Sequence, residues 1–184
     1  MLTLTIILGS VREGRLGKKV ADWVIAECKK RKFNANFIDP LEHEEILVFR
    51  NRYRNIKKPS ADLKKVQKMI QDADAYIAIT PEYNHSYTGA IKNVIDHFAE
   101  EYFYKCSGIV CYSNGSFGGI RAGEALIPVF KEIKAPTVSV MPIPKVQEVF
   151  DGNGNLKNEL FNEKIKKFLD DIEWYAHQLK KKRP

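Results

Sequence analysis

The sequence predicts a doubly wound α/β fold, in which helices cover both faces of a five-stranded parallel sheet. Two observations support this prediction. Short apolar, partly β-branched runs alternate along the chain with longer segments whose apolar residues recur at helical spacing. No internal repeat and no linker interrupts that alternation, so we expect a single domain over residues 1–184.

The regular elements follow one another in a simple order. Strands are predicted at residues 2–8, 33–38, 73–80, 107–113 and 136–141. Helices are predicted at residues 18–31, 60–72, 88–101, 121–133 and 159–182, with Ser60 as the cap of the second. A tight turn is predicted at residues 151–155.

The apolar residues of segment 39–59 recur with no clear periodicity, so we expect an irregular segment of the sort often found beside an active site. The segment carries Arg50, Arg52 and Arg54. These arginines could face an anionic cosubstrate, and a solvated loop is the alternative.

The net charge of +7 suits an anionic ligand such as a nucleotide phosphate, and by itself it would also suit nucleic acid. Much of the excess lies in residues 29–32 and 180–183, near predicted helix ends, where the helix dipole favours cations. No basic stretch is interleaved with aromatic residues, so we expect no nucleic-acid partner.

The chain has no run of roughly 18 apolar residues, so no membrane-spanning helix is expected. Its apolar start lacks a basic n-region and leads into a Gly-Ser turn, which indicates a strand rather than a signal peptide. The three cysteines, Cys28, Cys106 and Cys111, form no Cys-x-x-Cys pair. We therefore expect structural thiols in a reducing cytoplasm.

The loop after the first predicted strand is rich in glycine and leads into a helix. A helix N-terminus offers free N–H groups and partial positive charge, so this loop predicts a phosphate site with Ser10, Arg12 and Arg15 as donors. The dinucleotide fingerprint fails because Val11 replaces its second glycine. The P-loop fails because Arg15 and Leu16 replace its lysine and its magnesium-binding hydroxyl. We expect a phosphate-binding loop without a metal. The alternative is a glycine-rich turn that only connects the strand to the helix.

The loop after the third predicted strand, residues 81–90, is polar. Pro81 has no backbone N–H to donate to a neighbouring strand and should therefore end the strand. Glu82, Asn84 and the neighbouring amides can then meet a planar ring that carries donors and acceptors, although an ordinary surface turn is the alternative. A second glycine-rich loop, residues 114–122, follows the fourth strand, and its small residues would let a flat ligand approach the backbone.

These loops should meet in space. In the strand order 2-1-3-4-5, the strands that precede them are neighbours, and open α/β sheets bind ligands at such a switch point. One loop would bind a phosphate and the others would hold a ring system. The sequence therefore predicts a mononucleotide pocket, with FMN as the candidate ligand.

Three motifs occur in order along the chain: Gly9-Ser10-x-Arg12-x-Gly14-Arg15-x-Gly17, Pro81-Glu82-Tyr83-Asn84-x-Ser86-x-x-Gly89-x-x-Lys92-Asn93-x-x-Asp96 and Ser113-x-Gly115-x-x-Gly118-Gly119-x-Arg121-Ala122. Together they resemble the NADPH-dependent FMN reductase family. The resemblance implies a flavodoxin-like fold and an oxidoreductase that passes a hydride from NADPH or NADH through bound FMN to an acceptor. Free flavin, a quinone or an azo compound are such acceptors. It also implies homodimers or homotetramers, in which a neighbouring subunit helps to wall the flavin.

The resemblance assigns site residues by position. It implies that the FMN phosphate is held by Ser10, Arg12, Arg15 and Gly17. It implies that the isoalloxazine is edged by Pro81, Glu82, Tyr83 and Asn84, and that the third ligand loop contributes Ser113 and Gly115. One departure is Cys106, where many relatives have a proline; at the start of a strand it should affect function little.

Hydride transfer at flavin N5 needs orientation more than acid–base groups, so no general base is assigned. Asn84 offers both a donor and an acceptor and is the residue expected to assist. The four histidines lack metal-ligand spacing, so no metal is expected. The alternatives to an enzyme are a flavodoxin-type electron carrier, which the basic charge disfavours, and a flavin-bound redox-sensing or regulatory module.

Four aromatic residues cluster near the end of the helix predicted after the central loop, namely Phe98, Tyr102, Phe103 and Tyr104. Aromatic residues are enriched at protein interfaces, so the cluster favours an oligomer. Packing in the core is an equal alternative.

Overall fold

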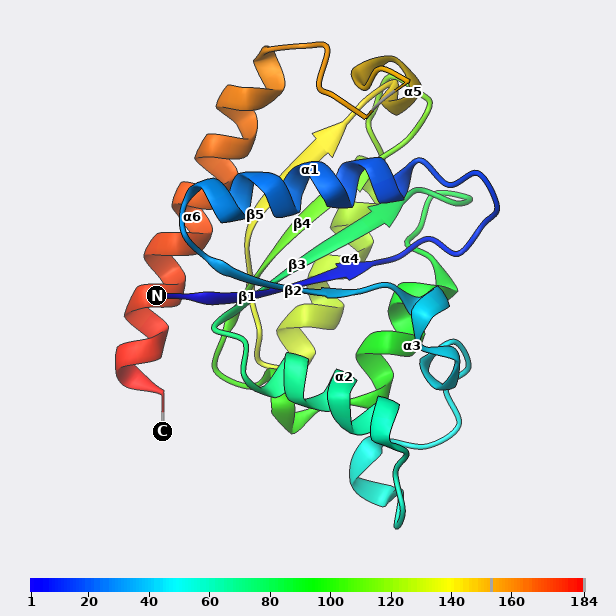
Figure 1. Cartoon of the computed structure of the whole chain (residues 1–184), viewed down its shortest axis with the longest axis vertical. Helices are drawn as coiled ribbons and strands as arrows, with labels where there is room; N and C mark the ends of the chain where they lie inside the picture. The colour runs from blue at the N-terminus through cyan, green and yellow to red at the C-terminus, as the bar shows by residue number, and fades with distance from the viewer. Residues whose placement is uncertain (153, 184) are drawn as a thin grey trace.

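Five parallel strands form one sheet in the computed structural model, which describes residues 1–152 and 154–183. The strands are β1 (Thr3–Leu8), β2 (Asn34–Ile38), β3 (Ala75–Pro81), β4 (Cys106–Tyr112) and β5 (Thr137–Ile143). They lie in the order β2-β1-β3-β4-β5 (Figure 1), which confirms the predicted flavodoxin-like topology.

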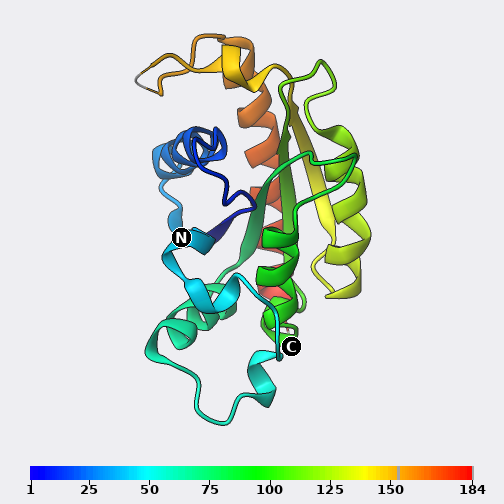
Figure 2. The ribbon, with the colours of Figure 1, turned by 90° about the vertical axis from the view of Figure 1, so that its right-hand side faces the viewer.

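Helices cover both faces of this sheet (Figure 2). On one face pack α1 (Gly17–Lys30) and α6 (Leu160–Lys182), and on the other pack α2 (Ala61–Gln71), α3 (Gly89–His97) and α4 (Ile120–Glu132). A short helix that the sequence did not predict, α5 (Val146–Val149), follows β5. Because β3 and β4 are covered on both faces, every residue of these strands is buried.

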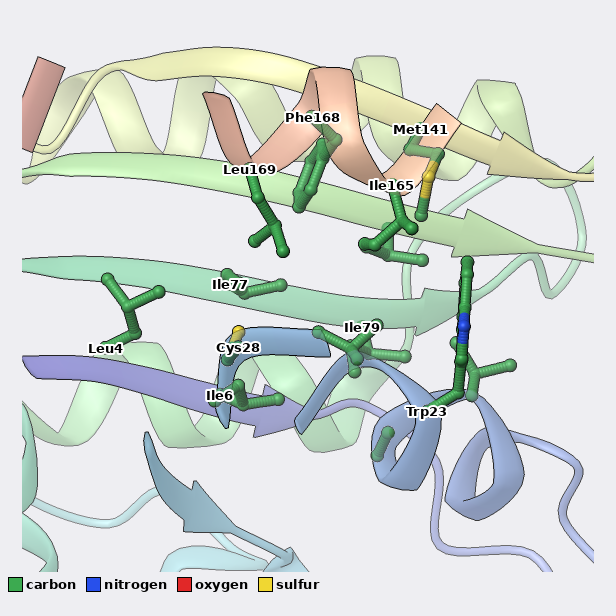
Figure 3. Packing of buried hydrophobic residues seen from close by; sticks show 14 of the residues in the cluster. Leu4, Ile6, Trp23, Cys28, Ile77, Ile79, Met141, Ile165, Phe168 and Leu169 are labelled. Atoms are coloured by element: carbon green, nitrogen blue, oxygen red, sulfur yellow. The ribbon is translucent and has the colours of Figure 1, made fainter. Parts of the chain in front are cut away.

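Apolar side chains fill the space between the sheet and the α1–α6 layer (Figure 3). From the strands come Leu4, Ile6, Ile77, Ile79 and Met141, and from the helices come Trp23, Cys28, Ile165, Phe168 and Leu169. Burying a large apolar side chain stabilises a fold by about 1.5–3 kcal/mol. This layer therefore gives the sheet a rigid base on which loops can be held.

The strand register brings the predicted ligand loops to one edge. Leu8 of β1 is aligned with Ile79 of β3, and Pro81 of β3 is aligned with Tyr112 of β4. The loops after β1, β3 and β4 therefore start side by side at the carboxyl edge of the sheet.

The structure corrects some predicted bounds. β3 includes Pro81, which tolerates the missing donor because it is the last residue of the strand. The helix expected to reach residue 101 ends at His97, because Phe98 takes an extended conformation and turns into the core; Glu100–Tyr102 then form a separate 3-10 turn. Of the turn predicted at residues 151–155, Asn153 lies outside the described residues.

The segment at residues 39–59 is irregular, as predicted. It contains three short 3-10 turns, Pro40–Glu42, Glu44–Ile46 and Tyr53–Asn55. Of its arginines, Arg54 forms an ion pair with Glu100. Ser60 caps α2 as predicted, and its hydroxyl accepts from the Leu63 N–H at 3.0 Å.

The predicted aromatic cluster divides between core and surface. Phe98 and Tyr102 are 2% and 0% exposed, so they belong to the core. Tyr104 is 46% exposed, and the Lys134 ammonium lies 5.4 Å from its ring centroid and 4.5 Å from that of Phe103. Core packing therefore accounts for half of the cluster.

The thiols of Cys28, Cys106 and Cys111 are free and buried, and burial raises their pKa from 9.0 to about 12. We expect a thiol reagent to label none of them in the native protein and all of them in denaturant. As pH rises above about 9, unfolded thiols ionise first, so the free energy of unfolding should fall. Urea unfolding at about pH 7 and about pH 10 measures this fall.

The buried amine of Lys105 changes the free energy of unfolding in the opposite direction. Burial lowers the pKa of Lys105 from 10.5 to about 8, so between these values the folded state releases its proton first and gains stability as pH rises. The three thiols outnumber this single amine. A free energy of unfolding that rises between about pH 7 and about pH 10 would contradict the expected balance.

Candidate functional site

A cavity of about 370 Å³ lies at the carboxyl edge of the sheet, where the three predicted loops meet. Its walls are formed by Arg12, Glu13, Gly14, Arg15, Leu16, Pro81, Glu82, Tyr83, Tyr112, Ser113 and Asn114. All three loops contribute, so the fold brings together segments that lie about a hundred residues apart in the chain. Thr88 ties two of these loops together, because its hydroxyl caps α3 and donates to the Gly9 carbonyl.

The first loop presents a buried hydroxyl beside a helix N-terminus. Ser10 is 1% exposed, and among the described residues its Oγ makes no hydrogen bond of standard geometry, although it lies close enough to the Tyr112 hydroxyl to interact with it. The N-cap of α1, Leu16, makes no side-chain hydrogen bond, and the first turn of α1 contains no acidic residue. A buried hydroxyl with no hydrogen bond of standard geometry and an uncapped helix N-terminus fit an anion such as a phosphate.

Gly17 allows β4 and the first loop to come close together. A Cβ at this position would lie 2.3 Å from the Tyr112 hydroxyl and 2.5 Å from Ser10 Oγ, so a larger residue would force these side chains to move. Burial raises the pKa of Tyr112 to about 12, and the nearby Ser10 hydroxyl and Arg15 charge offset it only in part. The Tyr112 hydroxyl therefore stays protonated at neutral pH, on the wall of the cavity.

The two arginines of the first loop differ in their surroundings. Arg12 is exposed, and its guanidinium lies 5.4 Å from the centroid of the Tyr83 ring. Arg15 is partly buried and forms a bidentate ion pair with Asp39, with distances of 2.8 and 2.5 Å. Sequence reasoning did not identify Asp39. Its position directly after the second strand, at the same edge of the sheet, is the signal that could have found it.

The central loop folds into a tight two-residue turn. The Tyr83 N–H donates to the Ser86 carbonyl at 3.0 Å, and the Ser86 N–H donates to the Tyr83 carbonyl at 3.1 Å. Between them, Asn84 and His85 have φ values of 51° and 66°. Consecutive positive φ angles are typical of a type I′ turn, for which Asn is favoured at the first position and Gly at the second. Asn84 is exposed at the tip of this turn, while Pro81, Glu82 and Tyr83 line the cavity.

His85 occupies the position that favours glycine in such a turn. We expect His85→Gly to stabilise the protein by about 1 kcal/mol, because it removes the cost of a left-handed backbone for a residue with a Cβ. For a protein of this size that corresponds to a melting temperature about 2–4 °C higher. His85→Ala is the control and should give no such gain, since it keeps the Cβ. Equal stabilisation by both variants would contradict the turn explanation.

Glu82 connects the second and third loops. Its side chain is 13% exposed, and its carboxylate accepts from the Arg121 backbone N–H at 3.2 Å and faces the Arg121 guanidinium at 3.5 Å. Arg121 lies in the first turn of α4, whose N-cap, Gly119, has no side chain to cap the helix. Glu82 therefore caps α4 from a different loop and holds two walls of the cavity together.

The third loop contributes Ser113, which lines the cavity, and Gly115, which is exposed. The Gly115 carbonyl accepts from Ser113 Oγ at 3.3 Å and from the Lys145 N–H at 3.1 Å. These bonds fold the loop back towards the end of β5. Gly115 thus shapes the loop, and Ser113 lines the cavity while its hydroxyl supports the fold of the loop.

Within residues 1–152 and 154–183, no group of three or more His, Cys, Asp or Glu side chains could hold a metal ion. In the same part of the chain, no helix has both the length and the apolar character needed to cross a bilayer.

Comparison with known proteins gives consistent results. Residues 2–146 match the family model for NADPH-dependent FMN reductase. An NAD(P)H-dependent FMN reductase of Nectria sp. is 31% identical over 162 residues, which cover 82% of this chain and 80% of the relative. An FMN-dependent NADPH-azoreductase of Staphylococcus haemolyticus is 26% identical over 175 residues, which cover 91% of both chains. The solved structure of FerB, an NAD(P)H:(acceptor) oxidoreductase from Paracoccus denitrificans, has the same fold, with a TM-score of 0.77 and 24% sequence identity. The match covers 97% of this chain and 98% of FerB.

Proposed function

The chain belongs to the NADPH-dependent FMN reductase family, and from this premise we propose that it transfers a hydride from NAD(P)H through bound FMN to a small acceptor. Free flavin, a quinone or an azo compound are the proposed acceptors, and the azoreductase among its relatives supports the last of these. The observation that carries the proposal is the buried Ser10 hydroxyl, which lies beside Gly17 at the start of α1 and next to Tyr112, a residue of the cavity that three loops form at the sheet edge. A mononucleotide phosphate fits this position.

We propose that Ser10, Arg12 and the amides that follow Leu16 hold the FMN phosphate, with Gly17 leaving room for them. Bound FMN would supply the hydride-accepting chemistry at its N5 atom. The chain's own contribution is orientation: Pro81, Glu82 and Tyr83 would edge the ring on one side, and Ser113 and Gly115 on the other. Asn84 would act through the turn that holds Tyr83 in place.

This arrangement orients a ring and excludes water from one edge of it. Preorganised dipoles are most effective where water is excluded, and the Tyr112 hydroxyl and the loop amides are such dipoles. No side chain of the cavity has to give or take a proton during hydride transfer.

An absorption spectrum before and after addition of NADPH tests the proposal. Protein mixed with FMN and separated from free flavin should keep a flavin spectrum, NADPH or NADH should bleach it without oxygen, and a quinone should restore it. Protein that retains no FMN would contradict the cofactor assignment. Protein that retains FMN but is not bleached by either donor would instead be a binding module.

We also propose that the chain forms a single domain that assembles as a homodimer or homotetramer in the cytoplasm. Two core clusters that share one sheet support a single domain. Free thiols at all three cysteines support a reducing compartment. Exposed apolar side chains such as Val48 and Phe49, which are 59% and 39% exposed, support association. Light scattering at micromolar concentration measures the oligomeric state. A monomer that binds FMN and catalyses NAD(P)H oxidation would contradict the proposed assembly.

A further inference from the structure

We propose that Arg15 and Asp39 form an internal brace that holds the first loop ready for the FMN phosphate. In this role Arg15 is a positioning residue and not a phosphate ligand. The inference rests on the proposed FMN site and replaces the direct contact that the family resemblance implies for Arg15.

The brace joins two segments that follow different strands. Arg15 lies in the loop after β1, and Asp39 directly follows β2. Arg15 Nη1 donates to Asp39 Oδ1 at 2.8 Å and to the Ser10 carbonyl at 2.6 Å, and Nη2 donates to Asp39 Oδ2 at 2.5 Å. One guanidinium therefore holds the end of β2 against Ser10, whose hydroxyl lies beside the first residue of α1.

Because both side chains are largely buried, separating Arg15 from Asp39 costs a large free energy. The Asp39 side chain is 2% exposed, that of Arg15 is 15% exposed, and Asp39 Oδ1 also accepts from the Leu41 N–H at 3.1 Å. Drawing Arg15 towards a ligand would leave a buried carboxylate without its cation, which is strongly unfavourable. Arg12 is exposed beside Tyr83, so it can turn towards a phosphate without breaking a buried ion pair.

The brace positions both proposed phosphate contacts. Its bond to the Ser10 carbonyl fixes the backbone from which Ser10 Oγ projects. The Arg15 N–H also donates to the Arg12 carbonyl at 3.3 Å, and Gly14, with a φ of 66°, closes the turn between them. A loop that is already ordered loses less conformational freedom when it binds a ligand. The brace therefore strengthens phosphate binding without touching the phosphate.

The substitution Asp39→Asn separates the two roles of Arg15 by the sign of its effect. If Arg15 braces the loop, loss of the carboxylate loosens it and FMN affinity should fall roughly tenfold, within the range for coupled neighbours. If Arg15 is a phosphate ligand, Asp39→Asn frees the guanidinium and removes a negative charge near the phosphate, so affinity should rise. Quenching of FMN fluorescence on titration with apoprotein measures the dissociation constant. Tighter or unchanged binding would overturn the brace.

Arg15→Lys is the second variant, because it keeps the positive charge and loses the bidentate geometry. It should weaken FMN binding as Asp39→Asn does, and unchanged affinity would overturn the brace even if Asp39→Asn failed to fold. The matched control is Asp22→Asn, which removes the exposed partner of Lys18 on α1. This control should leave FMN affinity unchanged.

The brace can also be tested without any ligand. Melting temperatures of the apoprotein, the two single variants and the double variant form a cycle, and the losses should not add, because both substitutions break one interaction. Additive losses would overturn the brace. If the wild-type protein binds no FMN, the proposed function fails, while this cycle still decides whether the brace exists.

Discussion

Arg12→Ala is expected to weaken FMN binding and to leave riboflavin binding almost unchanged. A hydrogen bond to a charged group contributes about 1.5–3 kcal/mol, so the dissociation constant of FMN should rise roughly 10- to 150-fold. The reason is that Arg12 is the exposed cation of the first loop, whereas the Arg15 charge is already paired with Asp39. Riboflavin lacks the phosphate and should not sense the loss.

Titration of the apoprotein with FMN and with riboflavin, at one ionic strength, measures this difference. Lys29→Ala is the control, because it removes the same charge from the far end of α1. It should leave both affinities unchanged. An equal loss of FMN and riboflavin affinity in Arg12→Ala would mean that the residue supports the ring or the fold and not the phosphate.

Gly119→Ala is expected to destabilise the protein by on the order of 3–5 kcal/mol, at the upper end of single substitutions. Gly119 has a φ of 76°, and a Cβ there would lie 2.7 Å from the Tyr112 carbonyl oxygen and 2.8 Å from the Tyr112 nitrogen. Both atoms belong to the backbone of a central strand, so no side-chain movement can relieve the clash. Because Gly119 is also the N-cap of α4, the wall held by Glu82 should shift and FMN affinity should fall.

Gly14→Ala is the matched control, because Gly14 has a φ of 66° and a Cβ there would meet nothing within 4 Å. It should show only the backbone cost of about 1 kcal/mol. Urea unfolding measures both variants. Similar losses for Gly14→Ala and Gly119→Ala would show that backbone conformation dominates and that the close approach to Tyr112 matters little.

The sequence by itself determined the fold class and the set of loops that form the cavity, and the strand order was inferred from the fold class. The first two features depend on local signals. Apolar periodicity reports which residues face a core, and glycine or proline marks where a strand gives way to a loop. The bounds shifted where tertiary contacts prevailed, as at Phe98, which leaves the helix because its ring packs in the core.

Only the tertiary structure decided which partner each polar side chain takes. Arg15 could be recognised from the sequence as a cation of the first loop, but its carboxylate partner lies 24 residues away at the end of another strand. Glu82 could be recognised as a ring-edge residue, but it caps a helix whose first turn lies 39 residues further along the chain. Such pairs depend on the register of parallel strands, which sets the distance between loops and leaves no local pattern in the sequence.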